Sequence, residues 1–134
     1  MDAIIAKYGL IAGASPPNIG GDVQKKILIA ERDVDVAEAL ESRLRARGYL
    51  TTWTADAGYA LDEFEATRPD LVIISLTHPE TDAFNLCRGV RSRPLGALVP
   101  ILLLGTGSES ISDVPGAIAV GADHYFEKPK GLGE

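Results

Sequence analysis

The sequence has only one cysteine, Cys87, so it cannot form an internal disulfide. That scarcity fits a reducing compartment, and we expect the protein in the cytoplasm. The sequence also lacks any apolar run near the roughly 18–20 residues of a membrane-spanning helix, which argues against membrane insertion. Positive charge is not in excess: the formal net charge is −6, whereas proteins that bind nucleic-acid phosphates present a basic face. A length of 134 residues suits one folded domain.

The first 25 residues precede the first predicted strand and differ in composition from the rest. Residues 3–11 carry apolar side chains at helical spacing, and we expect a short helix there. Gly13 to Gly21 is rich in glycine and proline, which predicts a linker. We therefore divide the chain into an N-terminal segment, residues 1–25, and a folded domain, residues 26–134. The apolar side chains of the short helix are Ile4, Ile5, Tyr8 and Ile11.

Three short apolar runs without polar alternation indicate strands that are buried on both faces of a parallel sheet. Two further segments rich in aromatic or β-branched residues also indicate strands. Helical patterns separate the strands, so the sequence predicts a doubly wound α/β fold with a five-stranded parallel sheet. The expected strands are 26–30, 49–54, 71–75, 99–104 and 124–127. The expected helices run from about 33 to 47, 56 to 68, 83 to 91 and 116 to 120, with a loop at 94–96.

The segment from about Lys26 to Pro129 resembles the response-regulator receiver domain. The resemblance lies in residues 26–31, 68–74, 94–101 and 121–129. It implies a flavodoxin-like sheet of strand order 2-1-3-4-5. That family places a phosphoryl group on an aspartate at the end of strand three, with Mg²⁺ held by this aspartate and by an acidic pair after strand one. A Thr or Ser after strand four and a Lys after strand five bind the phosphoryl oxygens.

At three chemical positions the sequence departs from the family pattern. Ser75 stands at the phosphoacceptor position, and Gly105 stands where the hydroxyl after strand four is expected. The acidic pair becomes Glu31 and Arg32. A hydroxyl cannot form an acyl phosphate, and one carboxylate beside a guanidinium makes a poor Mg²⁺ site. We therefore predict a pseudo-receiver that has lost phosphotransfer and needs no metal or other cofactor.

Two retained residues and one neighbour complete the degenerate pocket. Tyr125 and Lys128 match the family pattern, and we expect Lys128 to pair with Glu31 rather than to bind an anion. Arg32 would take the place of the metal and also pair with Glu31. Thr106 would supply the missing hydroxyl only if the fourth strand slipped by one residue, which would turn alternate side chains to the other face.

Two alternatives for the pocket stay open. Ser75 could accept a phosphate atypically, although a small polar residue at a strand end is the simpler interpretation. Lys128, Arg32 and the Gly105 turn could instead hold an anion or another small ligand. Outside the pocket, Cys87 lies on an apolar helical face and is expected in the core. His78 and His124 are expected at opposite ends of the sheet, so they would not share a metal.

The sequence after the fifth strand is short and rich in glycine, so we expect no fifth helix there. In receiver domains that helix covers one face of the sheet, and the bare apolar area would cost on the order of 10 kcal/mol. We expect residues 3–11 to dock over that face. A neighbouring subunit, or a helix beyond the end of this chain, are the alternatives.

The resemblance implies a non-enzymatic protein–protein interaction module in a bacterial-type two-component signalling system. Pocket chemistry adds the expectation that the module works without phosphorylation. The expected partner is another signalling protein or another domain of a larger protein, and the module could also form a homodimer. Neither nucleic-acid binding nor membrane insertion is expected.

Overall fold

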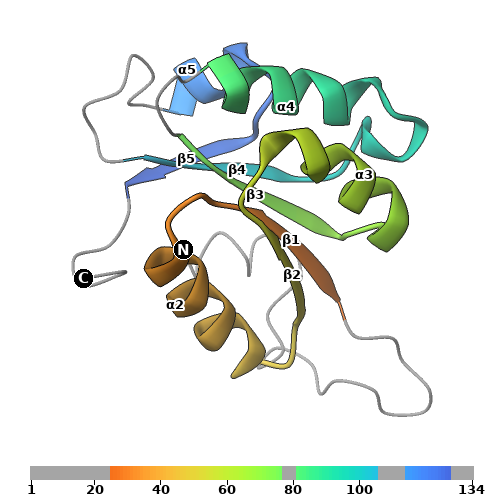
Figure 1. The fold of residues 1–134 in the computed structure, drawn as a ribbon. Helices are drawn as coiled ribbons and strands as arrows, with labels where there is room; N and C mark the ends of the chain where they lie inside the picture. The colour runs from red at the N-terminus through yellow and green to blue at the C-terminus, as the bar shows by residue number, and fades with distance from the viewer. Residues whose placement is uncertain (1–24, 77–80, 106–113, 128–134) are drawn as a thin grey trace.

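The computed structural model describes residues 25–76, 81–105 and 114–127. Five strands in these ranges form one parallel sheet of order β2-β1-β3-β4-β5 (Figure 1), which confirms the predicted doubly wound, flavodoxin-like fold. None of the helices described is long and apolar enough to cross a membrane. The elements are β1 (Lys26–Ala30), α2 (Val34–Arg45), β2 (Leu50–Thr54), α3 (Ala57–Thr67), β3 (Leu71–Ser75), α4 (Thr81–Ser92), the 3-10 turn η3 (Pro94–Gly96), β4 (Ile101–Gly105), α5 (Val114–Ala119) and β5 (His124–Glu127).

The sheet separates two hydrophobic layers, because successive side chains of a strand point to opposite faces. Helix α2 packs on one face, while α3, α4 and α5 lie on the other (Figure 1). Strands β3 and β4 are buried along their whole length, as their unbroken apolar runs predicted. The α2 layer includes Ile29, Leu40, Ile73 and Leu102, and the opposite layer includes Leu28, Phe64, Ile74 and Leu103.

Aspartates begin the first two described helices and fix where the chain turns at the ends of β1 and β2. The Asp33 carboxylate accepts hydrogen bonds from the backbone N–H groups of Asp35 and Val36, at 2.9 and 3.3 Å. Asp56 accepts the backbone N–H of Gly58 at 2.6 Å. Such caps satisfy donors that have no partner inside the helix. Both helices therefore start at the edge of the sheet where the strands end.

Several predicted boundaries need correction. Strand β4 begins at Ile101 rather than at residue 99, because the Val99 carbonyl accepts a hydrogen bond from Arg91 and Pro100 has no N–H for the ladder. Helix α5 begins at Val114 rather than at residue 116, since Pro115 occupies the first turn, where a missing N–H costs nothing. Helix α4 is longer at both ends than the predicted 83–91, and the predicted 94–96 loop is the turn η3.

Predictions about both ends of the chain concern residues outside these ranges. They include the helix at 3–11, its docking on the sheet, the boundary of the N-terminal segment and the missing fifth helix. All of them stay predictions.

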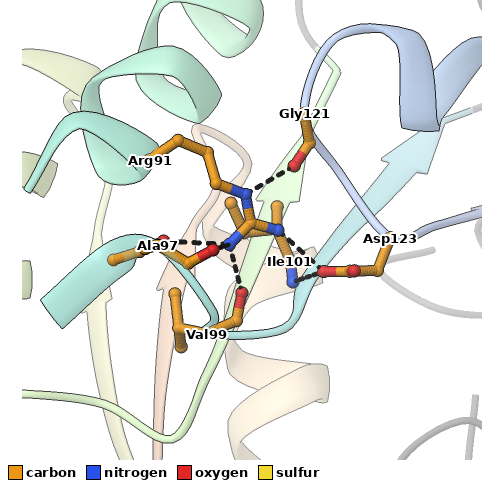
Figure 2. A network of polar contacts seen from close by, with 7 residues as sticks. Arg91, Ala97, Val99, Ile101, Gly121 and Asp123 are labelled. Carbon is orange, nitrogen blue, oxygen red and sulfur yellow. Dashed lines mark hydrogen bonds and ion pairs between the residues drawn. The ribbon is translucent and has the colours of Figure 1, made fainter.

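Arg91, in the last turn of α4, ties several segments together at the edge where the strands begin (Figure 2). Its Nε donates to the Gly121 carbonyl at 2.8 Å. Its Nη1 donates to the carbonyls of Gly96 and Val99 at 2.9 and 2.6 Å. Its Nη2 lies 2.8 Å from Asp123 Oδ2, so a single guanidinium joins η3, the start of β4 and the approach to β5.

The segments that Arg91 joins are also constrained by their own backbones. Asp123 Oδ2 accepts the backbone N–H of Ile101 at 2.8 Å, which aligns the starts of β4 and β5. A Cβ at Gly96 would lie 1.7 Å from the Val90 carbonyl oxygen, so only glycine fits against the end of α4. Gly121 has φ of 101°, a conformation that side chains with a Cβ rarely adopt. The fold therefore requires both glycines next to this arginine.

Replacing Arg91 by Ala should lower the free energy of unfolding by about 2–3 kcal/mol, because buried carbonyls and the Asp123 carboxylate lose a charged donor. Urea unfolding followed by the fluorescence of Trp53 would measure the loss. Arg93→Ala is the matched control: Arg93 forms a partly exposed ion pair with Glu65 at 3.1 Å, and such pairs contribute about 0–1 kcal/mol. Equal losses in the two variants would contradict the structural role assigned to Arg91.

Candidate functional site

Glu31 follows β1 directly and is the only charged side chain among the described residues that is nearly inaccessible, with an exposed fraction of 2%. Its backbone N–H donates to the Thr54 carbonyl at 3.0 Å, and its carbonyl accepts the indole N–H of Trp53 at 2.7 Å. These bonds to β2 and its end hold the Glu31 backbone. Burying a carboxylate is costly unless its oxygens are hydrogen-bonded.

Two donors of different kinds among the described residues bind the Glu31 carboxylate. Oε2 accepts the backbone N–H of Asp33 at 3.1 Å, and Oε1 accepts the hydroxyl of Ser75. Ser75 is the last residue of β3 and has an exposed fraction of 4%. Because β1 and β3 are neighbouring parallel strands, with Ala30 opposite Ile74, the two residues meet where the strands end. The serine hydroxyl is therefore committed to a buried carboxylate.

A partly open cavity of about 550 Å³ lies over this pair. Its apolar lining includes Ala30, Ile74 and Leu86. Its polar lining carries the carboxylates of Glu31, Asp56 and Asp82, and the guanidinium of Arg32 is the one cation among the described lining residues. Sequence reasoning missed Asp56 and Asp82 as pocket residues. The sequence could have indicated them, because both lie at the start of a helix that follows the end of a strand.

Arg32 is exposed at the wall of the cavity rather than buried beside Glu31. The Glu31 carboxylate accepts hydrogen bonds from Ser75 and from the Asp33 backbone, and the sequence did not predict the first of these. The predicted pairing of Arg32 with Glu31 stays a prediction.

The other predicted pocket residues divide between described and undescribed parts of the chain. Gly105 is the buried last residue of β4, one position beyond the pairing of Ser75 with Leu104. Tyr125 on β5 is 8% exposed and packs in the layer of α3 and α4. Thr106, Lys128 and His78 lie outside the described residues, so the predictions about them are untested by the structure.

His124 begins β5, at the edge of the sheet opposite the cavity. In the ranges 25–76, 81–105 and 114–127, no three His, Cys, Asp or Glu residues are grouped as metal ligands would be. Glu31 already accepts two hydrogen bonds, and its neighbour Ser75 carries no charge. These described residues do not fit the carboxylate set that normally holds Mg²⁺.

Sequence comparison agrees with the geometry. The family model for the response regulator receiver domain matches residues 27–134. The chain belongs to the response regulator receiver domain family. The receiver domain extends over the whole described sheet, and the cavity lies at the edge where this family carries out its phosphoryl chemistry.

Similar proteins include full-length regulators and isolated receiver domains. Response regulator MprA of Mycolicibacterium vanbaalenii is 36% identical over 109 residues, which are 81% of this chain and 46% of that protein. The chain thus spans about half the length of the curated relatives it matches. Two solved structures extend the comparison to chemotaxis and histidine-kinase proteins.

The first is the chemotaxis response regulator CheY4 of Vibrio cholerae, with a TM-score of 0.70 and 26% identity over 78% of this chain and 87% of that one. The second is the signal receiver domain of a signal transduction histidine kinase from Syntrophus aciditrophicus. It has a TM-score of 0.67 and 33% identity over 78% of this chain and 79% of that one. This receiver domain therefore resembles receiver domains that occur in different kinds of signalling protein.

Replacing Ser75 by Ala should cost about 1–3 kcal/mol of unfolding free energy, because the buried Glu31 carboxylate loses a donor. Ser75→Asp should cost more, since two carboxylates would then meet in a buried site. Chemical denaturation of both variants would measure these losses. Ser92→Ala is the matched control, because the Ser92 hydroxyl bonds the Gly89 carbonyl at an exposed position. A Ser75→Ala variant as stable as the control would contradict the importance of the Ser75–Glu31 hydrogen bond.

Cys87 is fully buried on α4, which confirms that it belongs to the core. Desolvation by burial raises its pKa from 9.0 to about 11, although the nearby Arg91 and Arg88 favour the thiolate. The thiol is therefore protonated and inert at neutral pH.

A raised pKa makes this cysteine a source of pH-dependent stability. The unfolded thiol ionises near pH 9 and the folded thiol only near pH 11. The stability it contributes is complete below pH 9 and falls by roughly 2 kcal/mol as pH rises to 11. Between pH 9 and 11 the free energy of unfolding should fall further in the wild type than in Cys87→Ala, and the difference should equal this contribution. Chemical denaturation of both proteins across that pH range would measure it. Parallel pH profiles would show that Cys87 does not titrate this way.

Proposed function

We propose that this receiver domain is a phosphorylation-independent, non-enzymatic interaction module of a two-component system. The observation that carries the proposal is the buried hydrogen bond from the Ser75 hydroxyl to the Glu31 carboxylate. In the family pattern an aspartate at the Ser75 position would accept phosphate and share a metal with the residue at the Glu31 position. In this chain the two side chains satisfy each other.

The chemistry of each altered position supports the proposal independently. Ser75 has no carboxylate, so it cannot form an acyl phosphate and adds no negative charge for Mg²⁺. Arg32 places a permanent cation at the wall of the cavity, which opposes metal binding further. Gly105 has no hydroxyl to donate to a phosphoryl oxygen. Together these positions lack the groups with which the family accepts a phosphoryl group and binds Mg²⁺.

Two alternatives are weaker on the same observations. Phosphorylation of Ser75 itself would require a hydroxyl that is only 4% exposed and already donates to Glu31. An anion or small anionic ligand in the cavity would face Glu31, Asp56 and Asp82, with Arg32 as the one opposing charge on the described wall.

The partner is expected to be a signalling protein or another domain of a longer chain. The relatives support this expectation, since one is a full-length response regulator and another is a receiver domain from a histidine kinase. A receiver domain in such a setting acts by presenting a surface. We expect the Ser75–Glu31 hydrogen bond to hold the pocket in one state, so that the surface would be constitutively available in the cytoplasm.

An amide NMR titration with Mg²⁺ and then beryllofluoride tests the proposal. We expect no shifts at Glu31, Ser75 or Gly105, since the site lacks the carboxylates that hold the metal. Shifts that need Mg²⁺ and extend from Ser75 to Tyr125 would overturn the proposal.

The positive control is the double variant Arg32→Asp with Ser75→Asp, which restores the acidic set of the family beside Glu31. We expect this variant to bind Mg²⁺ and to gain stability when Mg²⁺ is added, because bound cations relieve the repulsion among the three carboxylates. Arg32→Ala with Ser75→Ala removes the same side chains without adding carboxylates, and it should stay insensitive to Mg²⁺.

A further inference from the structure

The described charges of the chain are sorted to opposite edges of the sheet. Nine of the ten lysines and arginines in residues 25–76, 81–105 and 114–127 lie toward the edge where the strands begin. These nine residues lie at the start of β1, at the end of α2, after α3 and at the end of α4. They are Lys25, Lys26, Arg43, Arg45, Arg47, Arg68, Arg88, Arg91 and Arg93. We call this edge the basic edge. The exception is Arg32, at the wall of the cavity.

Four acidic residues at the basic edge are engaged locally, whereas Asp62 and Glu63 in the last two turns of α3 make no ion pair within the described residues. Glu41, Glu65 and Asp123 pair with arginines at 3.1, 3.1 and 2.8 Å, and Asp70 accepts the backbone N–H of Lys26 at 2.8 Å. Four exposed cations of this edge make no ion pair within the described residues, and they are free to meet another surface. They are Lys25, Arg43, Arg68 and Arg88.

At the opposite edge, where the strands end, the exposed charges of the described residues are mostly acidic. Its exposed aspartates are Asp33, Asp35, Asp56 and Asp82, all at or near the starts of α2, α3 and α4. We call this edge the acidic edge. Both edges owe some of this charge to helix dipoles, since acids favour helix starts and cations favour helix ends. The dipoles alone do not account for the apolar side chains that accompany the charges.

Five of the six large apolar side chains exposed among the described residues lie at these two edges. Leu50, Leu95 and Leu98 lie at the basic edge, where Leu98 is 93% exposed. Val34 and Tyr59 lie at the acidic edge, where Tyr59 is 65% exposed. Exposed apolar residues ringed by charge are typical of protein interaction sites. The turn that carries Leu95 is held by Arg91 through the Gly96 carbonyl.

From this arrangement we propose that copies of this chain associate head to tail, with the basic edge of one copy on the acidic edge of the next. A two-fold dimer through either edge would place like charges together, whereas the head-to-tail contact places opposite charges together. The leucines of one copy would then meet Val34 and Tyr59 of the next. The contact also covers the mouth of the cavity, because Asp56 and Asp82 line it. This proposal stands beside the proposed function and does not require it.

Sedimentation velocity of the full chain tests the proposal first. We expect the mass to rise with protein concentration beyond twice the 14.2-kDa monomer, since each copy keeps one free edge at each end of the stack. Added salt should weaken the association, because it screens the opposed charges. A wild type that remains monomeric at every concentration would overturn the proposal.

Two variants with one blocked edge each provide the decisive test. Arg88→Glu with Leu98→Glu makes the basic edge acidic, and Val34→Ser with Tyr59→Ser removes the apolar contacts of the acidic edge. Alone, the first variant should be monomeric and the second should associate at least tenfold more weakly than the wild type. Mixed in equal amounts, they should form a species of twice the monomer mass and stop there, since each contributes one intact edge. A mixture that forms no such dimer would contradict the head-to-tail contact.

Ile118→Ser is the matched control, because Ile118 is the remaining exposed large apolar residue and lies on α5, a helix that contributes neither a cation of the basic edge nor an aspartate of the acidic edge. This variant should associate as the wild type does. Loss of association in this variant alone would mean that the copies meet through α5, and the proposal would be wrong. Circular dichroism of all variants establishes that each is folded before its mass is measured.

Discussion

The parallel pairing of β1 with β3 is the constraint on which the rest of this structure depends. This pairing brings Ala30 opposite Ile74. The residues that follow them, one on each strand, therefore meet in a buried site. Glu31 and Ser75 are placed there by the register of the two strands. A buried carboxylate needs a donor, and the serine at the end of β3 supplies one. The chemistry of the site is thus a consequence of where two central strands end.

The same topology explains why the two edges of the domain differ. Strands of a parallel sheet all point one way, so every helix between them runs back and starts at the same edge. Aspartates that cap helices therefore collect where the strands end, and arginines that follow helices collect where the strands begin. Arg91 shows that the basic edge also has a structural role, because its guanidinium holds η3 and the starts of β4 and β5 together. The charge separation thus follows from the common direction of the strands.

Much of the site could be predicted from single residues, but not its contacts. The unbroken run that ends at Ser75 marked a buried strand end, and the resemblance of the surrounding segments identified the pocket position. The sequence suggested Arg32 as a partner of Glu31, and that pairing stays a prediction. The structure adds two donors that the sequence did not suggest, the Ser75 hydroxyl and the Asp33 backbone N–H. A partner in a neighbouring strand depends on side-chain direction and burial, which residue type alone does not determine. Boundaries near Pro100 and Pro115 were misplaced for a similar reason, because a proline's effect depends on which turn contains it.

The sequence by itself determined the fold class, the five strands and their buried character, because apolar periodicity and strand length depend on local residue type. It also determined that the phosphoacceptor position holds a hydroxyl. Only the tertiary structure decided that this hydroxyl satisfies Glu31, that Asp56 and Asp82 share its cavity, and that Arg91 joins segments about thirty residues apart. These contacts arise between distant parts of the chain, so they exist only once β1, β3 and β4 have paired in register.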